Sequence, residues 1–109
     1  MKVLVIGPGA VGCAVAIATA NAGMETSLIA RGDTAKFIRE NGLRRVGIFG
    51  DAAVSPACIA VYENYDQVPS DYDYIVVTVK TTSNDLVAGK LDKHRNIIGK
   101  NGKIILFQN

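Results

Sequence analysis

The chain has 109 residues, 49% of them hydrophobic, and a formal net charge of +2 at pH 7. This length suits one compact domain with a real core and is too short for two domains of ordinary size. Basic residues are spread along the chain, so neither a nucleic acid nor an anionic membrane is expected as a partner. No apolar stretch approaches the roughly 20 residues needed to span a bilayer, and no signal peptide is expected.

The two cysteines, Cys13 and Cys58, lie far apart and show no metal-ligand or redox spacing. We therefore expect packing thiols, no metal site and a reducing, cytoplasmic setting.

The first third of the chain has the pattern of a strand, a helix and a second strand. Residues 3–6 are a short apolar run that reaches a glycine cluster at once, as a buried strand ending in a turn would. Residues 10–22 are predicted to be helical, and Gly23 is the expected stop. A second strand is predicted over residues 26–30. The predicted apolar stripe of the helix consists of Val11, Val15, Ala18 and Ala22.

The next segment is less regular. A short helix carrying Phe37 and Ile38 is predicted to begin at an N-cap supplied by Asp33 or Thr34 and to end at residues 41–42. Two or three short strands are expected over residues 43–63, where apolar residues alternate with glycines and a proline.

The last third returns to strands and a helix. Residues 74–79 are predicted to form a central strand buried on both faces. A helix over 84–91, a turn at 100–102 and a last strand over 103–107 follow. Alternating strands and helices indicate an α/β fold with a Rossmann-type, doubly wound parallel sheet, truncated in its second half.

The strongest motif is the loop after the first strand, with the pattern Gly-x-Gly-x-x-Gly, which consists of Gly7, Pro8, Gly9, Ala10, Val11 and Gly12. Its place between a strand and a helix is the context that a dinucleotide-binding loop requires. Gly7 permits the tight turn, Gly9 lets backbone approach a pyrophosphate, and Gly12 allows close packing of the helix on the sheet. Pro8 lacks an N–H, so we expect the phosphate to be bound by N–H groups from Ala10 onward.

Arg31 stands at the end of the second predicted strand, where NAD-specific proteins usually have Asp or Glu for the ribose hydroxyls. A guanidinium there makes charge-assisted bonds to a 2′-phosphate, which favours NADP(H) over NAD(H). A solvated arginine at a strand end is the plainer interpretation.

Two further polar residues, Lys80 and Asn109, follow predicted strands at the carboxyl edge, where open α/β sheets bind ligands. Each is equally consistent with a cofactor contact and with an ordinary turn residue. His94 lies in a polar stretch and is expected at the surface, and no nucleophile–base pair or paired carboxylates can be singled out.

Taken together, these residues resemble the N-terminal domain of the ketopantoate reductase (2-dehydropantoate 2-reductase) family. Four segments carry the resemblance, which extends over the whole chain, and the stretch 43–71 contributes little. They are the 7–12 loop, Ile29-Ala30-Arg31, Thr78-Val79-Lys80 and Gln108-Asn109.

The resemblance implies NADPH-dependent reduction of a 2-oxo acid, ketopantoate, to pantoate on the route to pantothenate and coenzyme A. It implies that Lys80 lies beside the cofactor and that Asn109 contacts cofactor and substrate. Residues 1–109 correspond to the NADP-binding domain, and the catalytic lysine and its acidic partner belong to a C-terminal helical domain. We therefore expect these 109 residues to bind NADPH without turnover. The sequence does not decide whether the protein is a monomer or a homodimer.

Three alternatives remain at this point. The same cofactor domain can serve a two-domain dehydrogenase acting on another substrate. A nucleotide-sensing module, like the regulatory domains of potassium transport systems, opens with the same glycine pattern but usually carries an acidic residue where Arg31 stands. An interaction domain with a vestigial loop would bind no nucleotide.

Overall fold

The computed structural model describes residues 1–46 and 50–107. The strands of its larger sheet are β1 (Lys2–Ile6), β2 (Glu25–Ile29), β5 (Ile59–Tyr62), β6 (Tyr72–Val77) and β7 (Ile98–Leu106). The α-helices are α1 (Ala10–Asn21), α2 (Gly32–Asn41) and α3 (Asn84–Lys93). A small antiparallel hairpin consists of β3 (Leu43–Arg45) and β4 (Ala52–Val54). Short 3₁₀ turns are η1 (Pro56–Cys58), η2 (Tyr65–Gln67), η3 (Thr81–Ser83) and η4 (Arg95–Ile97).

The larger sheet is parallel and has the strand order β5-β2-β1-β6-β7. The chain moves outward from β1 through β2 to β5, then returns to the other side of β1 for β6 and β7. This is the strand order of a Rossmann-type domain, so the predicted fold class is confirmed. The point where the order reverses lies at the carboxyl ends of β1 and β6, where ligands of such sheets bind.

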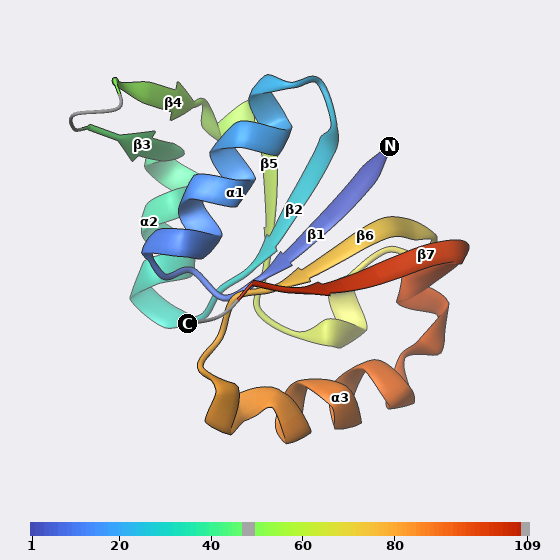
Figure 1. Ribbon diagram of the computed structural model, residues 1–109. Coiled ribbons are helices and arrows are strands. Elements are labelled where there is room, and N and C mark those ends of the chain that lie inside the picture. The colour runs from blue at the N-terminus through green and yellow to red at the C-terminus, as the bar shows by residue number, and fades with distance from the viewer. Residues whose placement is uncertain (47–49, 108–109) are drawn as a thin grey trace.

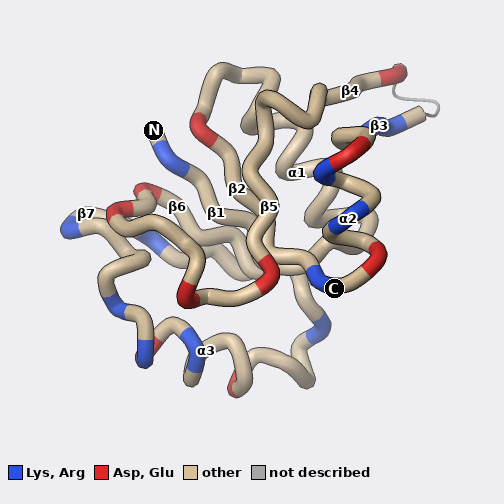
Figure 2. Tube along the Cα trace, turned by 180° about the vertical axis from the view of Figure 1, so that it is seen from behind, with Lys and Arg blue, Asp and Glu red and all other residues tan. Residues whose placement is uncertain are grey.

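Helices lie on both faces of the sheet (Figure 1), and the edge strand β7 is largely exposed. Helices α1 and α2 and the β3–β4 hairpin lie on one face, and α3 lies on the other. Figure 2 shows acidic and basic residues interleaved along both α2 and α3, rather than one surface of a single sign. Within the part of the chain that the structure describes, no helix is long and apolar enough to cross a membrane.

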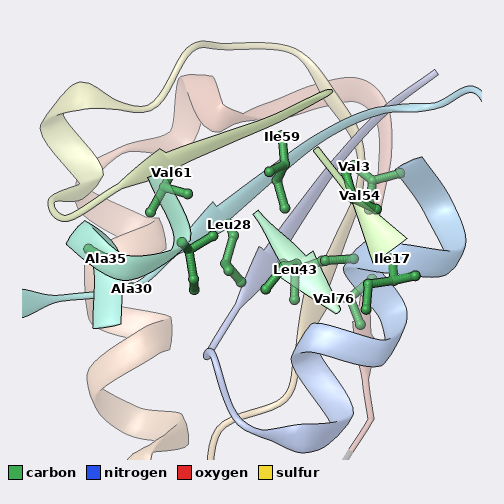
Figure 3. Packing of buried hydrophobic residues seen from close by; sticks show 13 residues of the cluster. Val3, Ile17, Leu28, Ala30, Ala35, Leu43, Val54, Ile59, Val61 and Val76 are labelled. Carbon is green, nitrogen blue, oxygen red and sulfur yellow. The ribbon is translucent and has the colours of Figure 1, made fainter. Parts of the chain in front are cut away.

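The alternation of side chains along the strands divides the core into two clusters. In β1, Val3 and Val5 face α1, whereas Leu4 and Ile6 face α3, because successive side chains of a strand point to opposite faces. Figure 3 shows the first cluster, in which residues of the sheet pack against Ile17 of α1 and the hairpin. Strands buried on both faces are continuously apolar, as residues 3–6 of β1 and 75–77 of β6 are.

The buried side of α1 differs from the predicted stripe. Gly12, Ala16 and Ile17 are buried, and Val15 packs against the core as predicted, but Ala18 and Ala22 are exposed, so the prediction was wrong for those two residues. Nearly every position of this helix is apolar or small, so its periodicity says little about its rotation. The helix instead places its smallest residues against the sheet. In α2, Ala35 and Ile38 form the buried side, and Phe37 is exposed.

Two other local predictions need correction. The segment 100–102 was expected to be a turn but lies inside β7, where the pairing with β6 is irregular: Tyr72 pairs with Ile98, and Tyr74 with Lys103. Cys58 was expected to pack inside and is exposed. The three short strands over 43–63 are present, but only β5 joins the parallel sheet.

Candidate functional site

The glycine loop connects the buried strand β1 to α1 at the carboxyl edge of the sheet. Gly7 has φ of +111°, a conformation that side chains other than hydrogen rarely adopt. A Cβ added to Gly12 would lie 1.9 Å from the carbonyl oxygen of Gly7, so only glycine lets α1 begin this close to the loop. A Cβ added to Gly9 would meet nothing within 4 Å. The side of the loop at Gly9 is therefore open for a ligand to approach the backbone.

Thr78 holds the loop from the neighbouring strand. Its hydroxyl lies 2.9 Å from the carbonyl oxygen of Ile6 and 3.1 Å from that of Gly7, and can donate its proton to either. A Cβ at Gly7 or Gly12 would also lie within 3.0 Å of the Thr78 Oγ1 atom. Thr78 lies in one of the four segments that carry the family resemblance. Its role at the loop could not be predicted, because it depends on the packing of β6 beside β1.

Helix α1 begins at Ala10 with Gly9 as its N-cap, and the Gly9 carbonyl accepts the N–H of Cys13 at 2.9 Å. Within the described residues, no side chain caps this N-terminus and no acidic residue stands in its first turn. An uncapped helix start offers backbone N–H groups and a partial positive charge to an anion. Pro8 is exposed beside it, and its carbonyl accepts a hydrogen bond from the Cys13 thiol at 3.2 Å. Burial raises the pKa of that thiol.

A cavity of about 330 Å³ opens between the loop, the end of β2 and α3. Gly7, Pro8 and Arg31 line it, so the structure brings the two main sequence predictions together. Most of its lining is apolar and consists of Ile6, Ile29, Ala30, Val79, Leu86 and Val87. Its polar lining residues are Thr34, Tyr65, Ser83 and Lys90. An apolar cleft of this size with a few polar groups suits a flat, partly polar ligand such as a nucleoside.

The polar residues of this cavity were not predicted from the sequence as site residues. Thr34 was considered only as a helix cap, and Tyr65 and Lys90 were not considered. Tyr65 is buried on η2, and Lys90 stands on α3. Their spacing in the sequence carries no signal, because they meet only where α3 folds back across the end of β2.

Arg31 occupies the N-cap position of α2 with extended backbone, and it is exposed. Burial raises the pKa of the Tyr65 hydroxyl, and the positive charge of Arg31 partly offsets that effect. Arg31 and Tyr65 line the same cavity. Asp33 or Thr34 was expected to cap α2, which was wrong: the helix begins at Gly32, whose N–H donates to Glu63 Oε1 at 3.0 Å.

Lys80 lies at the same edge of the sheet but outside the cavity. It is exposed at the N-cap of η3, and its carbonyl accepts the N–H of Ser83 at 2.8 Å. Gly9, Ala10 and Val11 also lie outside the cavity lining, on the continuing loop and the start of α1. Asn109 is outside the described residues, so its predicted contacts stay predictions.

His94 is not the free surface residue that was expected. Its side chain is 23% exposed, and its ring nitrogens lie 2.9 Å from the Lys90 carbonyl and 2.5 Å from Asp66 Oδ1. The Lys90 carbonyl first, and then Asp66, raise the pKa of His94 above its ordinary value. His94 thereby ties the end of α3 to η2, which supports the cavity wall at Tyr65. Among residues 1–46 and 50–107, no group of three His, Cys, Asp or Glu side chains could hold a metal ion.

The strand order and the open glycine loop define a Rossmann-type domain of the dinucleotide-binding class. The model of the family described as ketopantoate reductase PanE/ApbA matches residues 3–109. The chain belongs to the ketopantoate reductase family, a family of reductases that depend on a nicotinamide dinucleotide.

Solved structures support this assignment. A PanE/ApbA family ketopantoate reductase from Ralstonia eutropha JMP134 is 29% identical, with a TM-score of 0.83; the match covers 100% of this chain and 34% of that protein. A 2-dehydropantoate 2-reductase from Porphyromonas gingivalis W83 is 31% identical, with a TM-score of 0.72; the match covers 95% of this chain and 37% of that protein. The 2-dehydropantoate 2-reductase from Methylococcus capsulatus is 26% identical, with a TM-score of 0.78; the match covers 100% of this chain and 34% of that protein. No curated protein matched the sequence. The chain thus spans about a third of the length of these solved relatives.

Proposed function

We propose that residues 1–109 are the NADPH-binding domain of a cytoplasmic reductase that converts 2-dehydropantoate (ketopantoate) to pantoate, a step toward pantothenate and coenzyme A. Family membership supports the reaction class. The observation that carries the cofactor assignment is that the glycine loop and Arg31 line one and the same cavity. The open position at Gly9 and the uncapped start of α1 fit a pyrophosphate, and the apolar cavity fits an adenosine.

Arg31 is the proposed reader of the 2′-phosphate. It is exposed, lines the cavity and carries a permanent charge, which a 2′-phosphate matches and a 2′-hydroxyl does not. A hydrogen bond to a charged group contributes about 1.5–3 kcal/mol, equivalent to roughly ten- to a hundredfold in affinity.

The reduction needs the ketone held against the nicotinamide and a proton donor at the ketone oxygen. A bound nicotinamide supplies the hydride. Lys80 is proposed to lie beside the cofactor, and Asn109 to contact both cofactor and substrate. The proton donor is proposed to be a lysine of a helical domain that also carries its acidic partner, as the family resemblance implies.

The 109 residues alone are accordingly proposed to bind NADPH without turnover. The test is to mix the purified chain with NADPH and ketopantoate and follow the loss of NADPH absorbance. Measurable reduction above a protein-free blank would refute this part of the proposal.

The cofactor assignment is tested by titrating NADPH and NADH into the wild-type chain, Arg31→Ala and a control, Arg95→Ala. Arg95 pairs with Asp92 at the exposed end of α3, so its replacement makes the same charge change outside the cavity. We expect Arg31→Ala to weaken NADPH binding by about ten- to a hundredfold and NADH binding by less than about twofold. Equal losses for the two cofactors, or a similar effect of Arg95→Ala, would refute the role of Arg31.

A further inference from the structure

Glu63 connects the end of β5 to the start of α2. Its Oε1 atom accepts the N–H of Gly32 at 3.0 Å, and its Oε2 atom accepts a hydrogen bond from Arg39 Nη1 at 3.2 Å. The second terminal nitrogen of Arg39 donates to the carbonyl of Val61 at 3.0 Å. The carboxylate is therefore held by two donors of α2, the N–H of its first residue and the side chain of Arg39 in its last turn.

This carboxylate is charged and lies beside the proposed phosphate reader. The Gly32 N–H, followed by Arg39, lowers the pKa of Glu63, so the group is ionised at neutral pH. Gly32 directly follows Arg31, so the negative charge is bonded to the residue next to it. Arg39 pairs with Glu63, but the two side chains are 44% and 39% exposed. Solvent therefore weakens the attraction between them, so Arg39 does not fully cancel the negative charge of Glu63.

The Gly32 amide is one that an anion at this helix start would use. The first backbone N–H groups of a helix lack partners within the helix and bind phosphates readily. In this chain, Glu63 occupies the first of them. A 2′-phosphate at Arg31 would meet an occupied amide and a neighbouring like charge, whereas an uncharged 2′-hydroxyl would meet no such repulsion.

We infer that Glu63 is a specificity-determining residue that opposes Arg31 and narrows the preference of this site for NADPH over NADH. The inference rests on the proposed function, because it concerns the ribose end of the same cofactor site. It assigns the preference to a balance of two charges: Arg31 attracts the 2′-phosphate, and Glu63 limits that attraction.

The test is titration of NADPH and NADH into the wild-type chain, Glu63→Gln, Glu63→Asp and Glu25→Gln. Glutamine keeps an oxygen for the Gly32 N–H and removes the charge. Glu25 stands at the amino end of β2, away from the carboxyl edge, so Glu25→Gln controls for net charge. We expect Glu63→Gln to bind NADPH about tenfold more tightly and NADH within about twofold of wild type. The gain should shrink at high salt, where charge effects are screened.

Glu63→Asp separates charge from anchoring, because it keeps the charge on a shorter side chain. Unchanged or weaker NADPH binding by Glu63→Gln overturns the inference and leaves the proposed function standing. The same gain in Glu63→Asp or Glu25→Gln also overturns it, because the local charge would then not be the cause. A wild-type chain that binds neither cofactor overturns the proposed function and this inference together.

Discussion

Gly12→Ala is the sharpest test of how the loop and α1 fit together. Gly12 is the third residue of α1, and an added Cβ would lie 1.9 Å from the Gly7 carbonyl oxygen and 2.7 Å from the Thr78 Oγ1 atom. Real Cβ atoms essentially never come within 3.0 Å of such neighbours. The nearest neighbour is backbone, so α1 must lift away from the loop or the loop must change shape.

Two opposing effects set the size of the change. Replacing glycine by alanine inside a helix favours the helix by up to about 1 kcal/mol. Overpacking a tight contact costs about 1–3 kcal/mol, and this contact is at the severe end. We expect the free energy of unfolding to fall by about 1–2 kcal/mol. NADPH binding should fall by about tenfold or more, because the backbone that receives the pyrophosphate is displaced.

Gly89→Ala is the matched control. Gly89 lies inside α3, and a Cβ there would meet nothing within 4 Å. Urea unfolding followed by circular dichroism should show this variant unchanged or more stable by up to about 1 kcal/mol. If Gly12→Ala proves as stable as Gly89→Ala and binds NADPH as well as wild type, the close approach of α1 to the loop is not a constraint.

Two more predictions concern residues that hold the site in place. Thr78→Val removes the hydroxyl that bonds the Ile6 and Gly7 carbonyls, so it should lower the free energy of unfolding by about 0.5–1.5 kcal/mol. Thr82→Val on the exposed turn η3 is the control and should leave that free energy unchanged; equal urea midpoints for the two variants would contradict the prediction. For His94, a pKa raised in the folded state means that its contribution is complete below the ordinary pKa of 6.5 and is lost as pH rises through the folded value. The stability of wild type relative to His94→Gln should therefore be greater at about pH 5 than at about pH 8.5 in urea unfolding, and a difference independent of pH would disprove the link.

Local patterns in the sequence were sufficient to predict much of the fold. Gly7 and Gly12 stand where a strand turns into a helix, where a tight turn and close packing were predicted; the structure has a positive φ at the first and the close packing at the second. The positions of β1, β2 and β6 were predictable within about two residues. The runs in β1 and β6 are apolar because these strands are buried on both faces. The last strand begins at Ile98 rather than at the predicted residue 103, because β7 is largely exposed and its sequence is not continuously apolar. The rotation of α1 was not, because a helix that is apolar on all sides contains no signal for which side is buried.

What the sequence by itself determined is the glycine loop, the order of strands and helices, and the family, since each depends on residues adjacent in the chain. Only the tertiary structure decided which side chains share the cavity with Arg31. Tyr65 and Lys90 reach it from η2 and α3. Glu63, which directly follows β5, bonds Gly32 at the start of α2, thirty-one residues away along the chain. Such contacts depend on how separate elements pack. The charge balance at the ribose end of the site follows from that packing.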